Sequence, residues 1–287
     1  MKKLQSPIDL LKLAFETTKR QFWPLLICMF LPFLMGGGVA IMLAGPAVLA
    51  GILLKPLLLV IGLLLISGMV IISLWQGATS IELLAGATEK LGLNEALKKT
   101  WPKLGKYFGV SFLVSIMTFG AVIPFVLPVF VVAVWFSFAT YVVVLEGVGG
   151  IKALRISREY ARGKYFAILG RLAFLILIYM AFGFAQAFFQ LIFGKNIGAL
   201  FSIFNLPLSI LVMAYQYHLY KNLREIRGTI DPKAVELGKS KWIGLAIWGI
   251  VVTLIIPLLF IVMAVRFGIN AAEVKQPNYS YRQSLDI

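Results

Sequence analysis

Residues 150–193 read GIKALRISREYARGKYFAILGRLAFLILIYMAFGFAQAFFQLIF and join a short basic segment to a long apolar one. Between residues 166 and 193 the one charged side chain is Arg171. A helix needs about 20 mostly apolar residues to cross a bilayer, so this stretch predicts a membrane span. The segment before it carries a cation at every third or fourth residue, which predicts an amphipathic helix at the membrane surface.

The composition of the whole chain agrees with this reading. Its 287 residues are 60% hydrophobic and 14% charged, and the mean hydropathy is +0.92. A soluble domain is roughly 45–50% apolar and about 25% charged, and its surface could not hide so much apolar side chain. We therefore expect an all-α, polytopic bundle of transmembrane helices.

Apolar stretches of spanning length recur along the chain. We expect about seven spans, at residues 22–44, 56–77, two within 107–145, 166–193, 199–217 and 242–265. Pro124 and Pro128 mark the turn that divides 107–145, because proline removes a helical donor and clashes with the preceding turn.

The cations test this division and orient it. With the N-terminus in the cytoplasm, the cytoplasmic segments hold groups of five, five, six and six, or 22 of the 27 lysines and arginines. Cytoplasmic loops are enriched in these residues. We therefore expect a multi-pass protein of the cell membrane with a cytoplasmic N-terminus and an external C-terminus.

Three segments resemble one another. Each has alanine, an apolar residue, two variable residues and then serine or threonine, at residues 14–18, 96–100 and 153–157. Each soon reaches an aromatic pair that opens a span, as interfacial aromatics do. The unit is one amphipathic helix followed by one hairpin, and the first helix has Ser6 as its expected N-cap, followed by Pro7.

This repeat predicts the organisation of the chain. Residues 1–228 form a six-span domain of three hairpin units (6–86, 92–147 and 150–220). Residues 229–241 form a cytoplasmic linker, 242–265 the seventh span, and 266–287 a polar external tail. The amphipathic segments either lie in the interface or are ordinary basic linkers.

The net charge of the chain is +15, and the amphipathic segments carry many of its cations. Because the cations lie beside apolar runs, we expect attraction to anionic lipid headgroups on the cytoplasmic face rather than to nucleic acid. The residues expected to contact headgroups are Lys12, Lys19, Lys98, Lys99, Lys103, Arg155, Arg158 and Arg162.

Two motifs resemble a known family. The run VLEG at 144–147 with GIKALRISR at 150–158 and GKYF at 163–166 is one, and HLYKNLR at 218–224 is the other. They resemble the membrane domain attached to some bacterial glycerophosphoryl diester phosphodiesterases, and related polytopic proteins. The resemblance covers roughly residues 6–228 and implies six spans. The catalytic barrel of those enzymes needs about 250 residues, so we do not expect their activity here.

The sequence offers little chemistry. We expect no catalytic site, metal site or cofactor, because acids, histidine and nucleophiles form no known motif. Glu146 is the most informative acid, and we expect it to form a clasp with Arg155 or Arg158 at the cytoplasmic end of a span. The single histidine, His218, lies at the end of another span, where a hydrogen bond suits it.

Three functions are therefore considered. The first is a non-enzymatic scaffold or accessory protein that contacts anionic lipid and either shapes the local bilayer or docks an unidentified cytoplasmic partner. The second is a transporter or flippase of a lipid or small amphiphile, with a cavity near Gln186, Gln190 and Asn205. The third, an enzyme acting on lipid headgroups, would have to use Glu82, Glu146 and His218.

Overall fold

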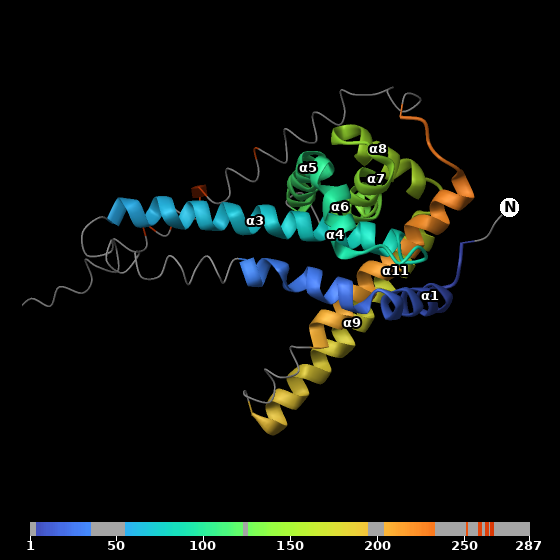
Figure 1. Ribbon diagram of the computed structural model, residues 1–287, viewed down its shortest axis with the longest axis horizontal. Coiled ribbons are helices and arrows are strands. Elements are labelled where there is room, and N and C mark those ends of the chain that lie inside the picture. Colours follow the sequence, from blue (N-terminus) through green and yellow to red (C-terminus); the bar gives the residue numbers. More distant parts are fainter. Residues whose placement is uncertain are drawn as a thin grey trace, which may run out of the picture. The chain divides into compact units, whose positions relative to one another are not determined.

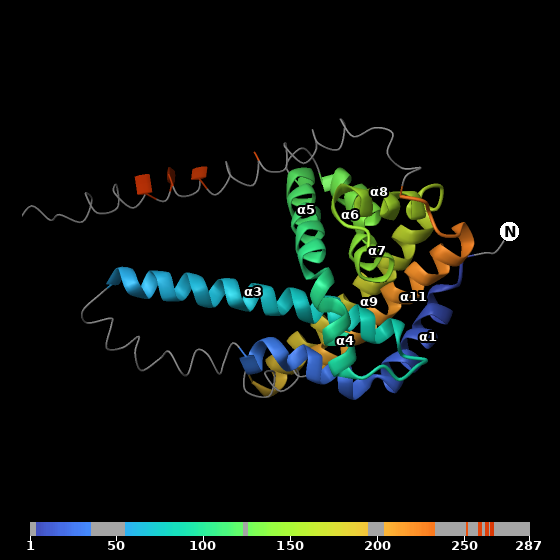
Figure 2. The ribbon, with the colours of Figure 1, turned by 45° about the horizontal axis from the view of Figure 1, so that its top comes forward.

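The computed structural model describes residues 4–35, 55–122, 126–194 and 204–232, with seven further positions between 251 and 266. Regular structure in these residues is helical, with no strand (Figure 1 and Figure 2). The chain divides into two compact units, residues 1–114 with 130–237, and residues 115–129 with 238–287. The expectation of an all-α fold is confirmed for the described residues.

Helix α1, Pro7–Arg20, begins as its sequence predicts. The Ser6 hydroxyl accepts a hydrogen bond of 3.1 Å from the backbone N–H of Asp9, and proline occupies the first turn. Asp9 lies in the first turn, and Lys19 and Arg20 lie in the last. These charges oppose the partial charges of the helix ends and stabilise the helix.

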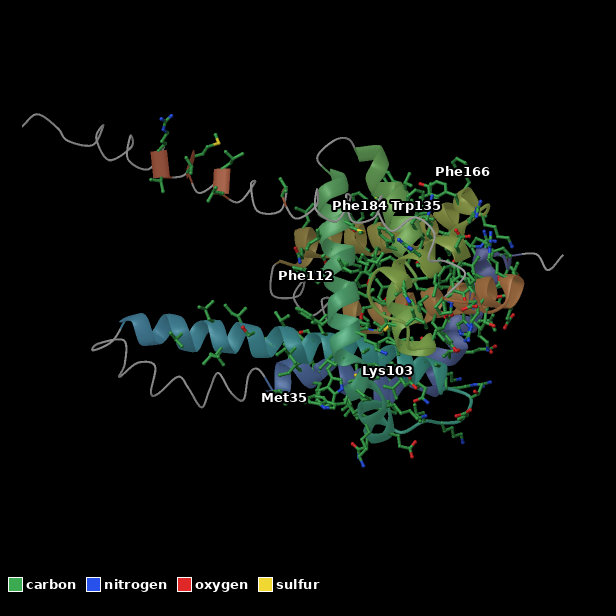
Figure 3. All side chains as sticks on the ribbon, turned by 90° about the horizontal axis from the view of Figure 1, so that it is seen from above. Met35, Lys103, Phe112, Trp135, Phe166 and Phe184 are labelled. Carbon is green, nitrogen blue, oxygen red and sulfur yellow. The ribbon has the colours of Figure 1, made fainter. Side chains whose placement is uncertain are left out.

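Two long apolar helices can cross a membrane. Helix α3, Lys55–Ala85, contains a candidate span at Gly62–Ala85, and helix α9, Tyr165–Phe193, is one along its whole length. The light-blue half of α3 and the yellow end of α9 extend beyond the helices around them in Figure 1. Leu64 is 68% exposed and Phe184, labelled in Figure 3, is 70% exposed. Such apolar surface suits lipid.

The apolar stretch 107–145 forms three helices. Helix α5, Leu104–Val122, precedes residues 123–125, and helix α6, Val126–Phe136, follows them. A break at residues 137–138, which was not predicted, separates α6 from α7, Ala139–Glu146. The predicted turn at Pro124 lies outside the described residues, whereas Pro128, the other proline of that prediction, lies within α6.

The remaining helices are short or polar. Helix α4, Leu93–Thr100, continues through the 3-10 turn η1, Trp101–Lys103, into α5. Helix α8, Gly150–Ala161, follows α7, and helix α11, Asn205–Arg227, closes the first unit. A shorter apolar helix, Phe22–Met35, follows α1.

The described residues therefore hold two candidate spans, or three if Phe130–Glu146 and Gly150–Ala161, bent by 117°, count as one. The seven predicted spans are not shown. Helices α6 and α7 are too short to cross singly, and α11 is apolar only in its first half. The predicted spans at 22–44 and 199–217 lie partly outside the described residues, and the linker after residue 232, the seventh span and the tail lie almost entirely outside them.

Helices α1, α4 and α8 each pack on other helices of the first unit. Helix α1 packs along α11, α4 packs along α3, and α8 packs on both α7 and α11. The largest fully buried side chains include Phe138, Tyr160, Tyr215 and Tyr220. The core of the first unit thus lies where α7, α8 and α11 meet.

Candidate functional site: three basic helices and the Glu146 cluster

Helices α1, α4 and α8 carry the predicted amphipathic segments and are called the basic helices here. Each buries one alanine completely: Ala14, Ala96 and Ala153 are all 0% exposed. A small side chain at this position lets each helix approach the apolar helix beneath it. The basic helices are therefore held by packing against protein as well as by their polar surfaces.

The hydroxyl four residues after each alanine is also buried. Thr100 accepts hydrogen bonds from Trp75 Nε1 at 3.2 Å and shares one of 3.0 Å with Thr79. Ser157 donates to the carbonyl oxygen of Trp135 at 2.6 Å and accepts from the N–H of Phe138 at 3.2 Å. Ser157 therefore satisfies backbone groups at the break between α6 and α7, which explains the break.

Thr18 occupies the same position in α1 but differs in one respect. Its side chain is 8% exposed, and its hydroxyl has no hydrogen-bond partner in the part of the chain that the structure describes. A buried polar group without a partner is uncommon in folded proteins, because its desolvation is uncompensated.

A groove lies beside each basic helix. The α1 groove, about 530 Å³, contains Lys19 with Phe22 and Trp23. The α4 groove, about 540 Å³, contains Lys98 with Trp75 and Trp101. In each of these two, a cation from the basic helix stands beside aromatic rings, a combination that suits the headgroup level of a membrane.

The α8 groove, about 480 Å³, follows the same pattern with more charge. It is lined by Arg158, Arg162, Trp135 and Tyr165, among others. The Arg158 guanidinium lies 4.4 Å from the centre of the Trp135 ring, a cation–π contact. Arg162 forms an ion pair of 3.4 Å with Glu159 and is exposed.

The predicted headgroup contacts occupy three kinds of place. Five of them are exposed at the surface, namely Lys12, Lys19, Lys98, Lys99 and Arg162. Arg158 and Lys103 are half-buried and have protein partners. Arg155 is only 4% exposed, although the helical pattern assigned it to the charged face. The reason is that α8 packs on two helices, α7 and α11, so residues 153–157 are all buried.

Lys103 and Lys106 cap the C-terminus of α7. Lys103 Nζ donates to the carbonyl oxygen of Val144 at 2.6 Å and lies 3.4 Å from a carboxylate oxygen of Glu82. Lys106 Nζ donates to the carbonyl oxygen of Gly147 at 3.0 Å. Cations stabilise the negative end of a helix. Lys103, labelled in Figure 3, therefore joins the η1 turn to α3 and α7.

The Glu146 carboxylate lies at the end of α7, as predicted, but its partners differ from the predicted clasp. Oε1 accepts hydrogen bonds from Tyr160 at 2.7 Å and from Tyr220 at 2.5 Å. Among the described residues, the cation within ion-pair distance is Arg224, at 3.6 Å, rather than Arg155 or Arg158. Burial, the first cause, and the hydrogen bond to Glu146 raise the pKa of both tyrosines.

These four residues form the Glu146 cluster: Glu146, Tyr160, Tyr220 and Arg224. Helical periodicity did not indicate it, because the partners come from two other helices, α8 and α11. A signal did exist in the two family-like motifs, since Glu146 lies in the first motif and Tyr220 and Arg224 lie in the second. The fold brings the two motifs together.

Helix α1 is tied to α11 by polar contacts. Thr17 Oγ1 and His218 Nε2 are 2.7 Å apart, and the N–H of Gln5 donates to Asn222 Oδ1 at 3.1 Å. Burial lowers the pKa of His218 to about 4, and the nearby charge of Lys221 acts in the same direction. His218 is therefore neutral near pH 7. It forms a hydrogen bond with α1, and a hydrogen bond is the role that its sequence position predicted.

The residues of the two other predicted sites are placed differently. Gln190 and Asn205 are exposed and Gln186 is half-buried, and these three line none of the grooves described above. The three residues considered for an enzymatic site have different partners. Glu82 pairs with Lys103, Glu146 accepts a hydrogen bond from Tyr220, and His218 bonds to Thr17. Among the described residues, no three His, Cys, Asp or Glu side chains lie close enough together to hold a metal ion.

Comparison with known proteins finds no matching protein-family model, no matching curated protein and no matching solved structure. The class that the described residues define is a helical protein with two or three helices long and apolar enough to cross a membrane. The resemblance of the two motifs to the phosphodiesterase membrane domain stays a hypothesis.

Proposed function

We propose that this chain is a multi-span protein of the cell membrane that acts as a non-enzymatic scaffold or accessory protein, with its basic helices on anionic lipid at the cytoplasmic face. Helices α3 and α9 supply candidate spans. The bias of 22 cations in 27 supports a cytoplasmic N-terminus. The three-unit repeat belongs to the same proposal, and the shared burial of Ala14, Ala96 and Ala153 supports it.

The observation that carries the proposal is the common makeup of the three grooves. Lys19, Lys98 and Arg162 each line a groove together with aromatic side chains. Each lysine or arginine near an anionic membrane surface contributes about 1 kcal/mol of attraction. Three such sites on one molecule would select anionic lipids from a mixture without any catalytic group.

The lipids that surround the protein test this proposal. The protein is reconstituted in a mixture of phosphatidylcholine and phosphatidylglycerol, extracted with a polymer that retains boundary lipid, and the retained lipids are quantified by mass spectrometry. We expect phosphatidylglycerol to be enriched over the bulk bilayer, with an enrichment that falls as salt screens the charges. A boundary composition equal to the bulk would overturn the proposal.

A matched pair of variants separates the grooves from diffuse charge. The double variant Lys98→Gln/Arg162→Gln removes two groove cations, and Lys90→Gln/Lys221→Gln removes two exposed cations that line none of the three grooves. We expect the first pair to reduce the enrichment severalfold and the second to change it little. Equal losses in the two variants would refute the role of the grooves.

A further inference from the structure

The α1 groove differs from the other two in being almost wholly apolar. It lies between α1, the Phe22–Met35 helix, α9 and α11, and its walls include Phe22, Phe182, Phe204, Leu208 and Leu211. The polar residues that line it are Thr18 and Lys19, which are adjacent in sequence. The groove is therefore amphipathic, with a long apolar wall and one cationic end.

The apolar wall excludes a polar ligand as the main occupant. An apolar surface is stabilised when another apolar group covers it, and water on such a wall finds few hydrogen-bond partners. The wall includes part of α9, a candidate span, so the surrounding bilayer is the nearest source of an apolar chain. Lys19 in turn favours an occupant with a negative charge at one end.

Thr18 gives an independent reason to expect a ligand. The equivalent hydroxyls of Thr100 and Ser157 are bonded to protein groups, whereas the Thr18 hydroxyl has no partner in the described part of the chain. The residue is 8% exposed and lines the groove, while its hydroxyl oxygen is itself buried. Rotation of the side chain about its Cα–Cβ bond toward the groove would let a ligand oxygen next to Lys19 satisfy this donor.

We propose that the α1 groove binds one anionic phospholipid of the bilayer, with an acyl chain along the apolar wall. The phosphate lies at Lys19, and the Thr18 hydroxyl donates a hydrogen bond to an ester carbonyl oxygen. This inference rests on the proposed function, because it requires the groove to face the membrane, and it adds one ordered lipid at a defined position.

Native mass spectrometry of the protein in a neutral detergent tests the site. Phosphatidylglycerol, phosphatidylcholine with the same acyl chains, and glycerol 3-phosphate are added separately. We expect one tightly bound phosphatidylglycerol, weaker binding of phosphatidylcholine, and no binding of glycerol 3-phosphate, which has no chain to cover the wall. Equal binding of the two phospholipids would overturn the role of Lys19 and with it the proposed position of the lipid phosphate in the groove.

Two matched pairs of variants locate the lipid. Leu208→Trp fills the groove, while Leu177→Trp makes the same change at a side chain of α9 that is 62% exposed. We expect the first to weaken phosphatidylglycerol binding by about tenfold or more and the second to leave it unchanged. Lys19→Gln should weaken it severalfold, and Lys90→Gln, which removes an exposed cation that lines none of the three grooves, should not.

Thr18→Val separates a ligand contact from a merely buried hydroxyl. The change removes the donor at nearly constant volume, so we expect unchanged or higher thermal stability of the lipid-free protein and severalfold weaker lipid binding. Unchanged binding together with higher stability would show that the hydroxyl does not contact lipid.

The outcomes also separate this inference from the proposed function. If Leu208→Trp binds phosphatidylglycerol as the wild type does while boundary enrichment persists, the groove site is refuted and the proposed function stands. If boundary enrichment is absent, the proposed function is refuted. If the protein self-associates in detergent and Leu208→Trp abolishes this association, the occupant of the groove is a second copy of the chain. That result would overturn the proposal that a phospholipid binds there.

Discussion

Tyr220 donates a hydrogen bond of 2.5 Å to Oε1 of Glu146, across 74 residues of sequence. Tyr160 donates to the same oxygen at 2.7 Å, and Arg224 lies 3.6 Å from it. The rings of Tyr220 and Tyr160 meet edge to face, with centres 5.7 Å apart. One carboxylate thus joins α7, α8 and α11 in the interior of the first unit.

Removing this acceptor should destabilise the protein. Glu146→Leu leaves two buried tyrosine hydroxyls without their acceptor, and each lost partner costs about 1–3 kcal/mol, so we expect a loss of about 3 kcal/mol. Thermal unfolding in detergent measures it. Glu146→Gln keeps an acceptor oxygen and should cost less, and Glu89→Leu, at an exposed turn, should cost little. Equal effects at positions 146 and 89 would contradict the cluster's structural role.

Ser157→Ala should weaken the junction between α6 and α7. The hydroxyl bonds to the carbonyl oxygen of Trp135 and the N–H of Phe138, and both groups are left unpaired by the change. We expect a loss of about 1–3 kcal/mol in the free energy of unfolding. Ser67→Ala is the control, because its hydroxyl is exposed and bonds to its own helix. The junction does not depend on Ser157 if both variants unfold alike.

Acidification should loosen α1 through His218. The unfolded histidine binds a proton below about pH 6.5, whereas the folded one has a pKa of about 4. Between these values the unfolded chain binds more protons, so stability falls as the pH decreases. Hydrogen exchange of residues 7–20 should accelerate as the pH falls from about 7 to about 5, beyond the intrinsic rate change.

The control for this prediction is His218→Gln, which keeps a partner for Thr17 but does not titrate in this range. We expect that variant to lose the acid-dependent part of the exchange. An identical pH dependence in the two proteins would assign the effect to the carboxylates instead.

Gly86→Ala tests the close turn after α3. A Cβ at this position would lie 2.5 Å from Cβ of Leu91, which is buried at 7% exposure. Because such overlap forces backbone shifts, we expect a loss of about 1–3 kcal/mol in thermal unfolding experiments. Gly109→Ala, within α5, has no atom within 4 Å of its new Cβ and should be neutral or stabilising. A neutral Gly86→Ala would show that the turn can relax.

The proposed orientation is testable with single cysteines, because Cys28 is buried and is the one cysteine of the chain. In a Cys28→Ala background, Lys90→Cys lies in an exposed turn and Asn278→Cys in the predicted external tail. A membrane-impermeant maleimide should label position 278 in intact cells and position 90 only after permeabilisation. Labelling of position 90 in intact cells would show that the topology is the reverse of the proposed one.

Local features of the sequence were sufficient to predict several of the helices and the start of α1. Ser6 and Pro7 start α1, because capping and proline geometry act within a few residues. The apolar length of residues 166–193 likewise predicted α9. The number of spans did not follow in the same way, since apolar runs such as 107–145 are divided by contacts made elsewhere.

The sequence by itself therefore determined composition, charge bias and local helix signals, which depend on neighbouring residues. Only the tertiary structure decided that Arg155 is buried, that Glu146 is held by Tyr160, Tyr220 and Arg224, and that Thr18 is left without the partner that Thr100 and Ser157 have. Helical periodicity assigns a residue to a face of its own helix, but packing decides whether that face meets solvent, lipid or a second helix.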